Sequence, residues 1–329
     1  MLTKRQNLIE TIRGGHPDRF VNGMEALATI RRSPYGKEFP RAQRGGEPVK
    51  NGWGVTIQFP ADAPGPFPIH DEEHIVLKDI ENWRDYVKAP ALNYTEEDWA
   101  EAAADAAAID RNEYFATVMI TPGVFEQCHY LMSMVEALVA FCTNPDEMHE
   151  LIDYITEFEL KYAEQICKYV KPDAILHHDD WGSLTKSFMS PEMFGEFIVP
   201  AFKKIYGYYK THGVELIIHH SDSYAANLVP QMIEMGIDVW QGPASTNNIK
   251  ELIEKYGEKI TFMGEVDNTV VDVEGWTDEI VYDQVKKVCD KNGMKYFVPC
   301  ILGGTCNRGV SEAVVKAVAK YNTERFGIC

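Results

Sequence analysis

The stretch ELIIHHSD, residues 215–222, joins a short run of large aliphatic residues to a polar ending. A short apolar run rich in β-branched residues predicts a strand that is buried on both faces, as in a parallel sheet covered by helices. In parallel α/β folds the functional groups lie at the carboxyl ends of the strands. The stretch therefore predicts one strand of such a sheet and a part of a site at its end.

Similar runs recur on both sides of this stretch, and amphipathic segments separate them. One of these segments is marked as a helix by Ser190, which can act as a cap, and by Pro191, which suits the first helical position. This alternation predicts a parallel sheet of the (β/α)8 TIM-barrel type, in the α/β class. The other runs are residues 114–120, 174–178, 238–241, 261–264 and 296–299. We expect the remaining two barrel strands near residues 20–24 and 55–59.

Composition and length fit one soluble barrel domain over residues 1–329, in which residues 1–110 form a less regular, partly helical extension. A net charge of -18 disfavours partners such as nucleic acid or an anionic membrane. No apolar stretch approaches the length of a membrane span or a signal peptide, so we expect a cytoplasmic protein. Seven cysteines without CxxC pairs predict reduced thiols.

Polar side chains follow most of the predicted strands, at the point where each apolar run stops. Because the carboxyl ends of barrel strands meet at one mouth, we expect these residues to converge there. They are Asp179, Asp180 and Trp181, the segment 219–222, then Gln241, Glu265 and Cys300. The convergence predicts an active site.

His220 and Asp222 have the spacing of two side chains on the same side of an extended segment. Cys300, at the end of the last strand, would complete a set of three metal ligands with one open position, as in catalytic zinc sites. Purely structural roles for these residues stay open, because strand-end histidines and aspartates also cap helices, and a free cysteine often behaves as a small buried apolar residue. Cys306 competes with Cys300 as the thiol ligand.

Four segments carry a resemblance to the uroporphyrinogen decarboxylase superfamily. They are HHDDWGSLTKSFMSPEMFGEFIVPAFKKI (177–205), LIIHHSDSYAANLVPQMIEMGIDVWQG (216–242), ITFMGEVDN (260–268) and FVPCILGG (297–304). The resemblance implies a (β/α)8 barrel and one of two activities: metal-free decarboxylation, or zinc-dependent methyl transfer with a corrinoid protein.

The methyltransferase branch fits this sequence better. The chain has no arginine-rich segment like the one with which the decarboxylase branch grips its polyanionic substrate. In the methyltransferase pattern, His-x-Cys and a second cysteine bind zinc, and these positions fall on His220, Asp222 and Cys300. Aspartate in place of a thiolate is a harder ligand, which favours a methyl donor with oxygen as the leaving group.

The segments WGVTIQFP (53–60), PGPFP (64–68) and HDEEHIVLKDIENWRDYVKAP (70–90) resemble the subset of the superfamily associated with anaerobic O-demethylation. The resemblance implies an O-demethylase methyltransferase I, which moves a methyl group from a methoxylated aromatic donor to the cobalt of a separate corrinoid protein. Glu265 and Asp180 would then be catalytic. Tyr224, Trp181, His178 and Gln241 would contact the substrate, and Trp53 and Phe59 could stack on it.

Two other functions stay open. One is metal-free decarboxylation of a smaller acid, in which Asp180 or Asp222 would stabilise a cationic intermediate. The other is a non-catalytic subunit that binds a small molecule. The direction of transfer and the methyl donor are not decided by the sequence, and a homodimer stays open.

Overall fold

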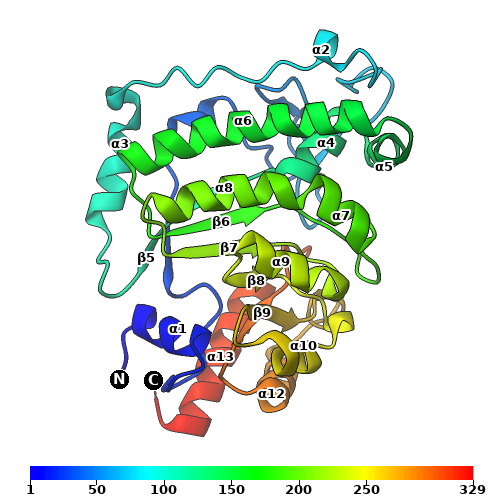
Figure 1. Cartoon of the computed structure of the whole chain (residues 1–329). Coiled ribbons are helices and arrows are strands. Elements are labelled where there is room, and N and C mark those ends of the chain that lie inside the picture. The colour runs from blue at the N-terminus through cyan, green and yellow to red at the C-terminus, as the bar shows by residue number, and fades with distance from the viewer. Residues whose placement is uncertain (329) are drawn as a thin grey trace.

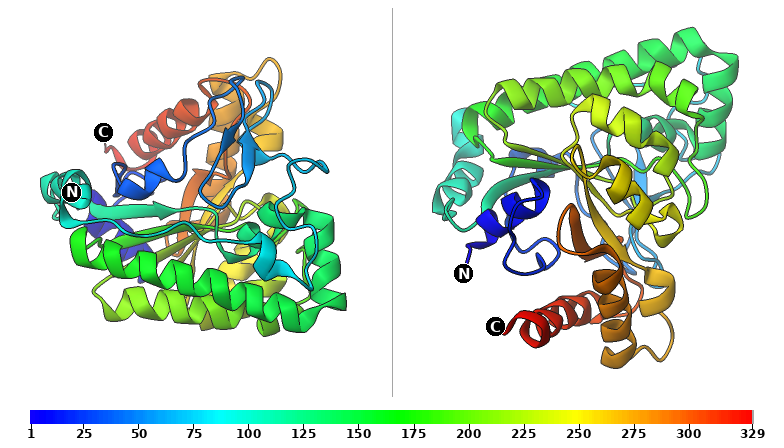
Figure 2. Two further views of the ribbon diagram at one scale, coloured as in Figure 1. Left: turned by 90° about the horizontal axis from the view of Figure 1, so that it is seen from above. Right: turned by 60° about the horizontal axis from the view of Figure 1, so that its bottom comes forward.

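Seven parallel strands form the central sheet of the computed structural model, which describes residues 1–328. In spatial order they are β1 (Leu27–Ile30), β5 (Phe115–Ile120), β6 (Ala174–His178), β7 (Leu216–His220), β8 (Val239–Gln241), β9 (Thr261–Val266) and β10 (Phe297–Ile301). The sheet curls, and helices cover its outer side (Figures 1 and 2). The α/β class and the barrel type of fold are confirmed, as are all six strands predicted from residue 114 onward.

The two early strands were wrongly predicted. Gly23 turns the chain with a φ of +54°, which interrupts the run at residues 20–24, and the barrel strand is β1 instead. Residues 56–58 form β3 (Thr56–Gln58), which pairs antiparallel with β2 (Val49–Lys50) and β4 (Phe67–Pro68) in a separate small sheet. Each of these strands has only two or three residues, and each pairs with its neighbours in sequence instead of joining the barrel sheet.

The small antiparallel sheet lies near the loop that follows β10. The guanidinium of Arg44 donates a hydrogen bond of 2.9 Å to the carbonyl of Thr305. The carbonyl of Pro64 lies so close to Gly304 that a Cβ there would be 2.1 Å from it. The part of the chain around Arg44 and Pro64 therefore borders the end of the barrel at which the strands terminate.

The first residues of the chain lie beside the last strand and the last helix (Figure 2). Val21 joins the same buried cluster as Val298 of β10. The main chain of Phe20 forms hydrogen bonds of 3.0 and 2.9 Å with the side chain of Asn322. This segment occupies the space between the edge strands β1 and β10, which do not pair with each other.

The helices surround the sheet and alternate with its strands. Ser190 caps α7 as predicted, because its hydroxyl accepts a hydrogen bond of 3.2 Å from the amide of Met193. No helix within residues 1–328 is long and apolar enough to cross a membrane. The helices are α1 (Lys4–Ile12), α2 (Trp83–Tyr86), α3 (Glu96–Ala108), α4 (Val124–Met132), α5 (Met134–Thr143), α6 (Pro145–Tyr169), α7 (Pro191–Phe197), α8 (Val199–Thr211), α9 (Val229–Met235), α10 (Ile249–Tyr256), α11 (Asn268–Val271), α12 (Asp278–Asn292) and α13 (Val310–Phe326).

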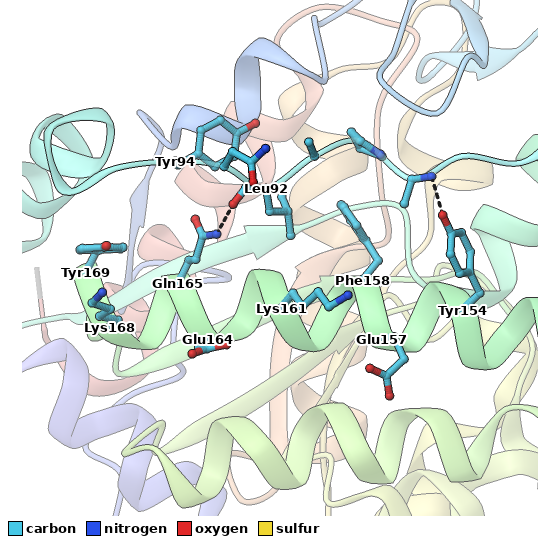
Figure 3. Close-up of a pocket in the computed structure, with 14 residues that line it drawn as sticks. Leu92, Tyr94, Tyr154, Glu157, Phe158, Lys161, Glu164, Gln165, Lys168 and Tyr169 are labelled. Atoms are coloured by element: carbon cyan, nitrogen blue, oxygen red, sulfur yellow. Dashed lines mark hydrogen bonds between the residues drawn. The ribbon is translucent and has the colours of Figure 1, made fainter.

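An extended segment, residues 89–94, runs along α6 (Figure 3). The amide of Ala89 donates to the hydroxyl of Tyr154 at 3.0 Å, and the side chain of Gln165 donates to the carbonyl of Leu92 at 2.6 Å. A pocket of about 570 Å³ lies between the segment and the helix. These contacts fix the N-terminal part of the chain onto the helical layer.

Alternation along the strands divides the buried residues into two clusters. Leu176, Ile218 and Val239 belong to the interior cluster, whereas Ile175 and Ile217 belong to the larger cluster beneath the helices. Since every second residue faces the same side, His178, His220 and Gln241 continue the interior rows at the carboxyl ends of β6, β7 and β8. The fold thus brings two histidines and a glutamine from three neighbouring strands to one place.

Gly182, in the loop after β6, packs against the loop after β7. A Cβ at this position would lie 2.4 Å from the carbonyl oxygen of Tyr224 and 2.8 Å from that of Lys186. We expect Gly182→Ala to lower the free energy of unfolding by about 1–3 kcal/mol, measured by urea denaturation. Gly195→Ala in α7 is the control, because no atom would contact its Cβ and alanine favours a helix by about 0.5–1 kcal/mol. An unchanged midpoint for Gly182→Ala would contradict the close packing of the two loops.

Candidate metal centre

The imidazoles of His178 and His220 lie side by side where β6 and β7 end. The two residues are partners in the parallel register, and their rings stack with centroids 4.4 Å apart and planes 17° apart. His220 is 8% exposed and His178 is partly buried. A stacked pair of this kind directs the same edge of both rings toward one point.

Each imidazole is held through its Nδ1 atom. Nδ1 of His178 is 2.7 Å from a carboxylate oxygen of Glu126 in α4, and Nδ1 of His220 bonds to Oε1 of Gln241. The amide nitrogen of Gln241 donates to the carbonyls of Leu302 and Ile301 at 2.9 and 3.3 Å. Because Oε1 of Gln241 must then accept, Nδ1 of His220 carries the proton, and its Nε2 has a free lone pair.

Both Nε2 atoms face the carboxylate of Asp180. Nε2 of His178 is 4.0 Å from Oδ2, and Nε2 of His220 is 4.0 Å from Oδ1. These separations exceed hydrogen-bonding distance, and the ligand atoms of the three residues all lie within 4.8 Å of one another. The same carboxylate accepts a 2.9 Å hydrogen bond from the amide of Asp222. Two imidazoles and one carboxylate with fixed outer partners match the donor set of a catalytic zinc site.

The surroundings give the two histidines opposite protonation preferences. Burial, aided by the charge of His178, lowers the pKa of His220 to about 4 and keeps this imidazole neutral. Burial also acts to lower the pKa of His178, but the carboxylates of Glu126, Asp180 and Asp222 outweigh it and raise the pKa to about 10. Burial and the charge of Asp180 raise the pKa of Asp222 to about 7. The centre therefore concentrates acidic groups around the two rings, as a cation site requires.

Residues 50–319 match the family model described as uroporphyrinogen decarboxylase (URO-D). The chain belongs to the uroporphyrinogen decarboxylase family. The match covers the strands β5 to β10 and every residue of the candidate metal centre. The superfamily expected from the sequence is therefore confirmed.

A solved methyltransferase structure has the same fold. This family member is similar to a methyltransferase from Methanosarcina mazei, with a TM-score of 0.67 and 15% sequence identity over 98% of this chain and 99% of that chain. A B12-independent methionine synthase from Shewanella sp. W3-18-1, in complex with selenomethionine, aligns with a TM-score of 0.45 and 12% identity over 71% and 70% of the two chains. None of the curated proteins matches the sequence.

The cluster of potential ligands in the structure shares only His220 with the set predicted from the sequence. Asp222 contacts the loop after β10, where a Cβ on Gly303 would lie 2.2 Å from its carboxylate, and Asp180 takes the place facing the imidazoles. Cys300 is not in the group of close ligand atoms. Its side chain packs in the apolar interior with Met263 and Val298, and burial raises the pKa of its thiol to about 12. Cys306 is exposed.

Among the predicted catalytic and substrate residues of this uroporphyrinogen decarboxylase family member, Asp180, His178 and Gln241 lie at the centre. Tyr224 is partly exposed in the loop after β7, and its amide donates to the carbonyl of Ser183. Glu265 turns away, because its carboxylate pairs with Lys291 at 2.6 Å and with Asn292.

The three aromatic residues considered for substrate stacking have other contacts. Trp181 stacks on His219 with centroids 3.7 Å apart, in the layer beneath the helices, and its indole N–H donates to Asp179. Trp53 packs against Phe158 of α6, and Phe59 lies under the guanidinium of Arg44. Packing in the helical layer thus explains why Trp181 and Trp53 are buried.

Glu126 was missed by the sequence reasoning. It lies in α4, far from His178 along the chain, and a lone glutamate in a helix carries no local signal of a role. Asp179 precedes Asp180 and faces the other way: its carboxylate accepts the amides of Phe125 and Glu126 at 3.1 and 2.7 Å. It therefore caps α4 and positions the carboxylate that holds His178.

Proposed function

We propose that the protein transfers a methyl group from a small methylated compound, a methoxylated aromatic donor, to the cobalt of a corrinoid carried by a partner protein. Zinc would be held by His178, Asp180 and His220. The observation that carries this proposal is the convergence of the Nε2 edges of two imidazoles on one carboxylate at the carboxyl ends of β6 and β7. Because the neighbouring carboxylates favour the protonated form of His178, zinc would bind by displacing the proton from its Nε2. Bound there, zinc would act as a Lewis acid on the oxygen of the departing group.

The protein's own residues would keep the ligands oriented. Gln241 fixes the tautomer of His220, and Glu126 anchors His178. The amide of Asp222 donates to Oδ1 of Asp180, which restrains the carboxylate. Outer contacts of this kind raise metal affinity by keeping the donor atoms in place before the metal arrives.

The donor set supports oxygen as the leaving atom. Neither of the two thiolates of the methyltransferase pattern is in the cluster, and imidazole and carboxylate ligands leave a metal harder than thiolates do. A harder metal polarises an ether oxygen better than it activates a thiol. The corrinoid partner rests on the resemblance of the sequence to the O-demethylating methyltransferases. The similar fold of a methyltransferase supports methyl transfer in general.

The test combines metal analysis with a transfer assay. Protein purified under reducing, chelator-free conditions is analysed for metals and then incubated with methoxylated aromatic compounds and reduced cob(I)alamin. We expect about one zinc per chain and the appearance of methylcobalamin by absorption, both lost after dialysis against a chelator. Release of CO₂ from a carboxylated compound by metal-free protein would contradict the proposal and show that the protein is a decarboxylase. Tight binding of the donor without turnover would indicate a binding subunit.

Gln241→Leu removes the acceptor that orients His220 while keeping a side chain of similar size. We expect about 10- to 100-fold weaker zinc binding, measured by competition with a chromophoric chelator, with an unchanged circular dichroism spectrum. Gln231→Leu in α9 is the matched control and should bind zinc normally. Equal affinity in both variants would show that Gln241 does not position the ligand.

A further inference from the structure

The interior of the barrel is open on one side of the candidate metal centre. One row of side chains crosses four neighbouring strands in parallel register and consists of Met119 (β5), Leu176 (β6), Ile218 (β7) and Val239 (β8). The row faces the interior, because its last three members belong to the interior cluster. Val239 and Ile218 are fully buried, and Leu176 is 6% exposed. Met119, at the end of the row, is 43% exposed. The interior is therefore filled beside β7 and β8 and open beside β5.

The next row toward the carboxyl ends shows the same gradient. Gln241 is buried, the side chain of His220 is 10% exposed, and that of His178 is 24% exposed. His178 lies two residues beyond Leu176, the register partner of Met119. With about 3.3 Å per residue along a strand and about 4.8 Å between strands, the Cα atoms of Met119 and His178 are about 8 Å apart. The open space therefore adjoins the more exposed side of the metal centre.

Met119 gives this space an apolar and polarizable lining. A large apolar side chain that is exposed inside a concave part of a fold is typical of a ligand site. The thioether sulfur of methionine makes favourable contacts with the edges of aromatic rings, and its flexible side chain adapts to a flat ligand. On the other side of β5, the exposed Thr29 of β1 is the register partner of Thr117, which shares its face of β5 with Met119. The lining suits an aromatic ring better than a charged group.

We propose that Met119 is the residue that seats the aromatic ring of the methyl donor in the open space beside β5, with the methoxy oxygen directed toward His178 and Asp180. A ring in contact with the thioether is close enough to bring a methoxy group to the ligand atoms. A saturated ring lacks the π system that the sulfur contacts, so Met119 favours aromatic over alicyclic ethers. This inference rests on the proposed function and names the residue that selects the donor.

Nuclear magnetic resonance of protein labelled with ¹³C-methyl methionine tests the contact without a transfer reaction. In the wild type with zinc added, we expect the Met119 resonance, identified by its loss in Met119→Leu, to shift upfield on addition of 2-methoxyphenol. It should stay in place with 2-methoxycyclohexanol, because only the aromatic compound has a ring current. A shift without formation of methylcobalamin in the transfer assay would retain the ring site and reject methyl transfer. Methylcobalamin formed while the Met119 resonance stays unmoved would overturn this inference alone, and the absence of both responses would reject both proposals.

Donor kinetics give a second readout. Met119→Ala should raise KM for 2-methoxyphenol about 10-fold with little change in kcat or zinc content, because the ring contact is lost while the metal ligands stay in place. Val315→Ala is the control, since this side chain is 51% exposed on the outer helix α13, and it should behave as the wild type. Equal KM values in Met119→Ala and the wild type would overturn the proposal.

Discussion

Replacing His220 by alanine is expected to remove the bound metal and to lower kcat/KM for methyl transfer by at least about 1,000-fold, or about 4 kcal/mol in transition-state free energy. His220 is the residue shared by the ligand set predicted from the sequence and the cluster of potential ligands in the structure. Its free Nε2 faces Oδ1 of Asp180, and its proton is fixed on Nδ1 by Gln241. The measurements are zinc content by elemental analysis and the initial rate of methylcobalamin formation.

The matched control is His212→Ala, at the end of α8, where the side chain is exposed and bonds locally to the carbonyl of Tyr208. This variant should retain zinc and activity. Activity lost in His220→Ala with zinc retained would mean that His220 contacts the substrate rather than the metal. Full zinc content and full activity in His220→Ala would show that the candidate metal centre takes no part in the reaction.

The strands from residue 114 onward could be predicted because each is a continuous apolar run between amphipathic helices. Both faces of such a strand are buried, so its sequence alone carries the signal. The N-terminal strands have two to four residues, and their pairing depends on distant partners: β1 pairs with β5 across more than eighty residues of chain. The local sequence does not indicate that pairing, which explains why the prediction near residues 20–24 was wrong.

The cluster that forms the candidate site could be anticipated from the sequence only in part, for a related reason. Alternation indicates which face of a strand a side chain occupies, so His220 and Gln241 could be assigned to the interior. It does not indicate which residues from neighbouring loops meet there. Asp180 lies two residues beyond the end of β6, and its carboxylate accepts a hydrogen bond from the amide of Asp222 in the next strand-end loop. The apolar neighbours of Cys300 come from β9 and β10 and from residue 21, which only the folded chain brings together.

Asp179 and Asp180 are adjacent aspartates for which we expect opposite outcomes on replacement by asparagine. The oxygens of Asp179 accept the amides of Phe125 and Glu126 and the indole N–H of Trp181. In Asp179→Asn, the new NH₂ group must face one of these donors, so we expect the free energy of unfolding to fall by about 2–3 kcal/mol. This value is measured by urea denaturation in the presence of a chelator, which removes any contribution from bound metal.

Asp180→Asn should leave that free energy almost unchanged, because Asp180 is partly exposed and an asparagine Oδ1 can still accept the amide of Asp222. It should instead bind zinc much more weakly, since a neutral amide is a poor substitute for a carboxylate between two imidazoles. The two variants have the same chemical change one residue apart, so a difference in their effects must come from the surroundings. If Asp180→Asn were the unstable variant and Asp179→Asn lost zinc, the roles of the two carboxylates would be reversed, and the ligand set would have to be built on Asp179.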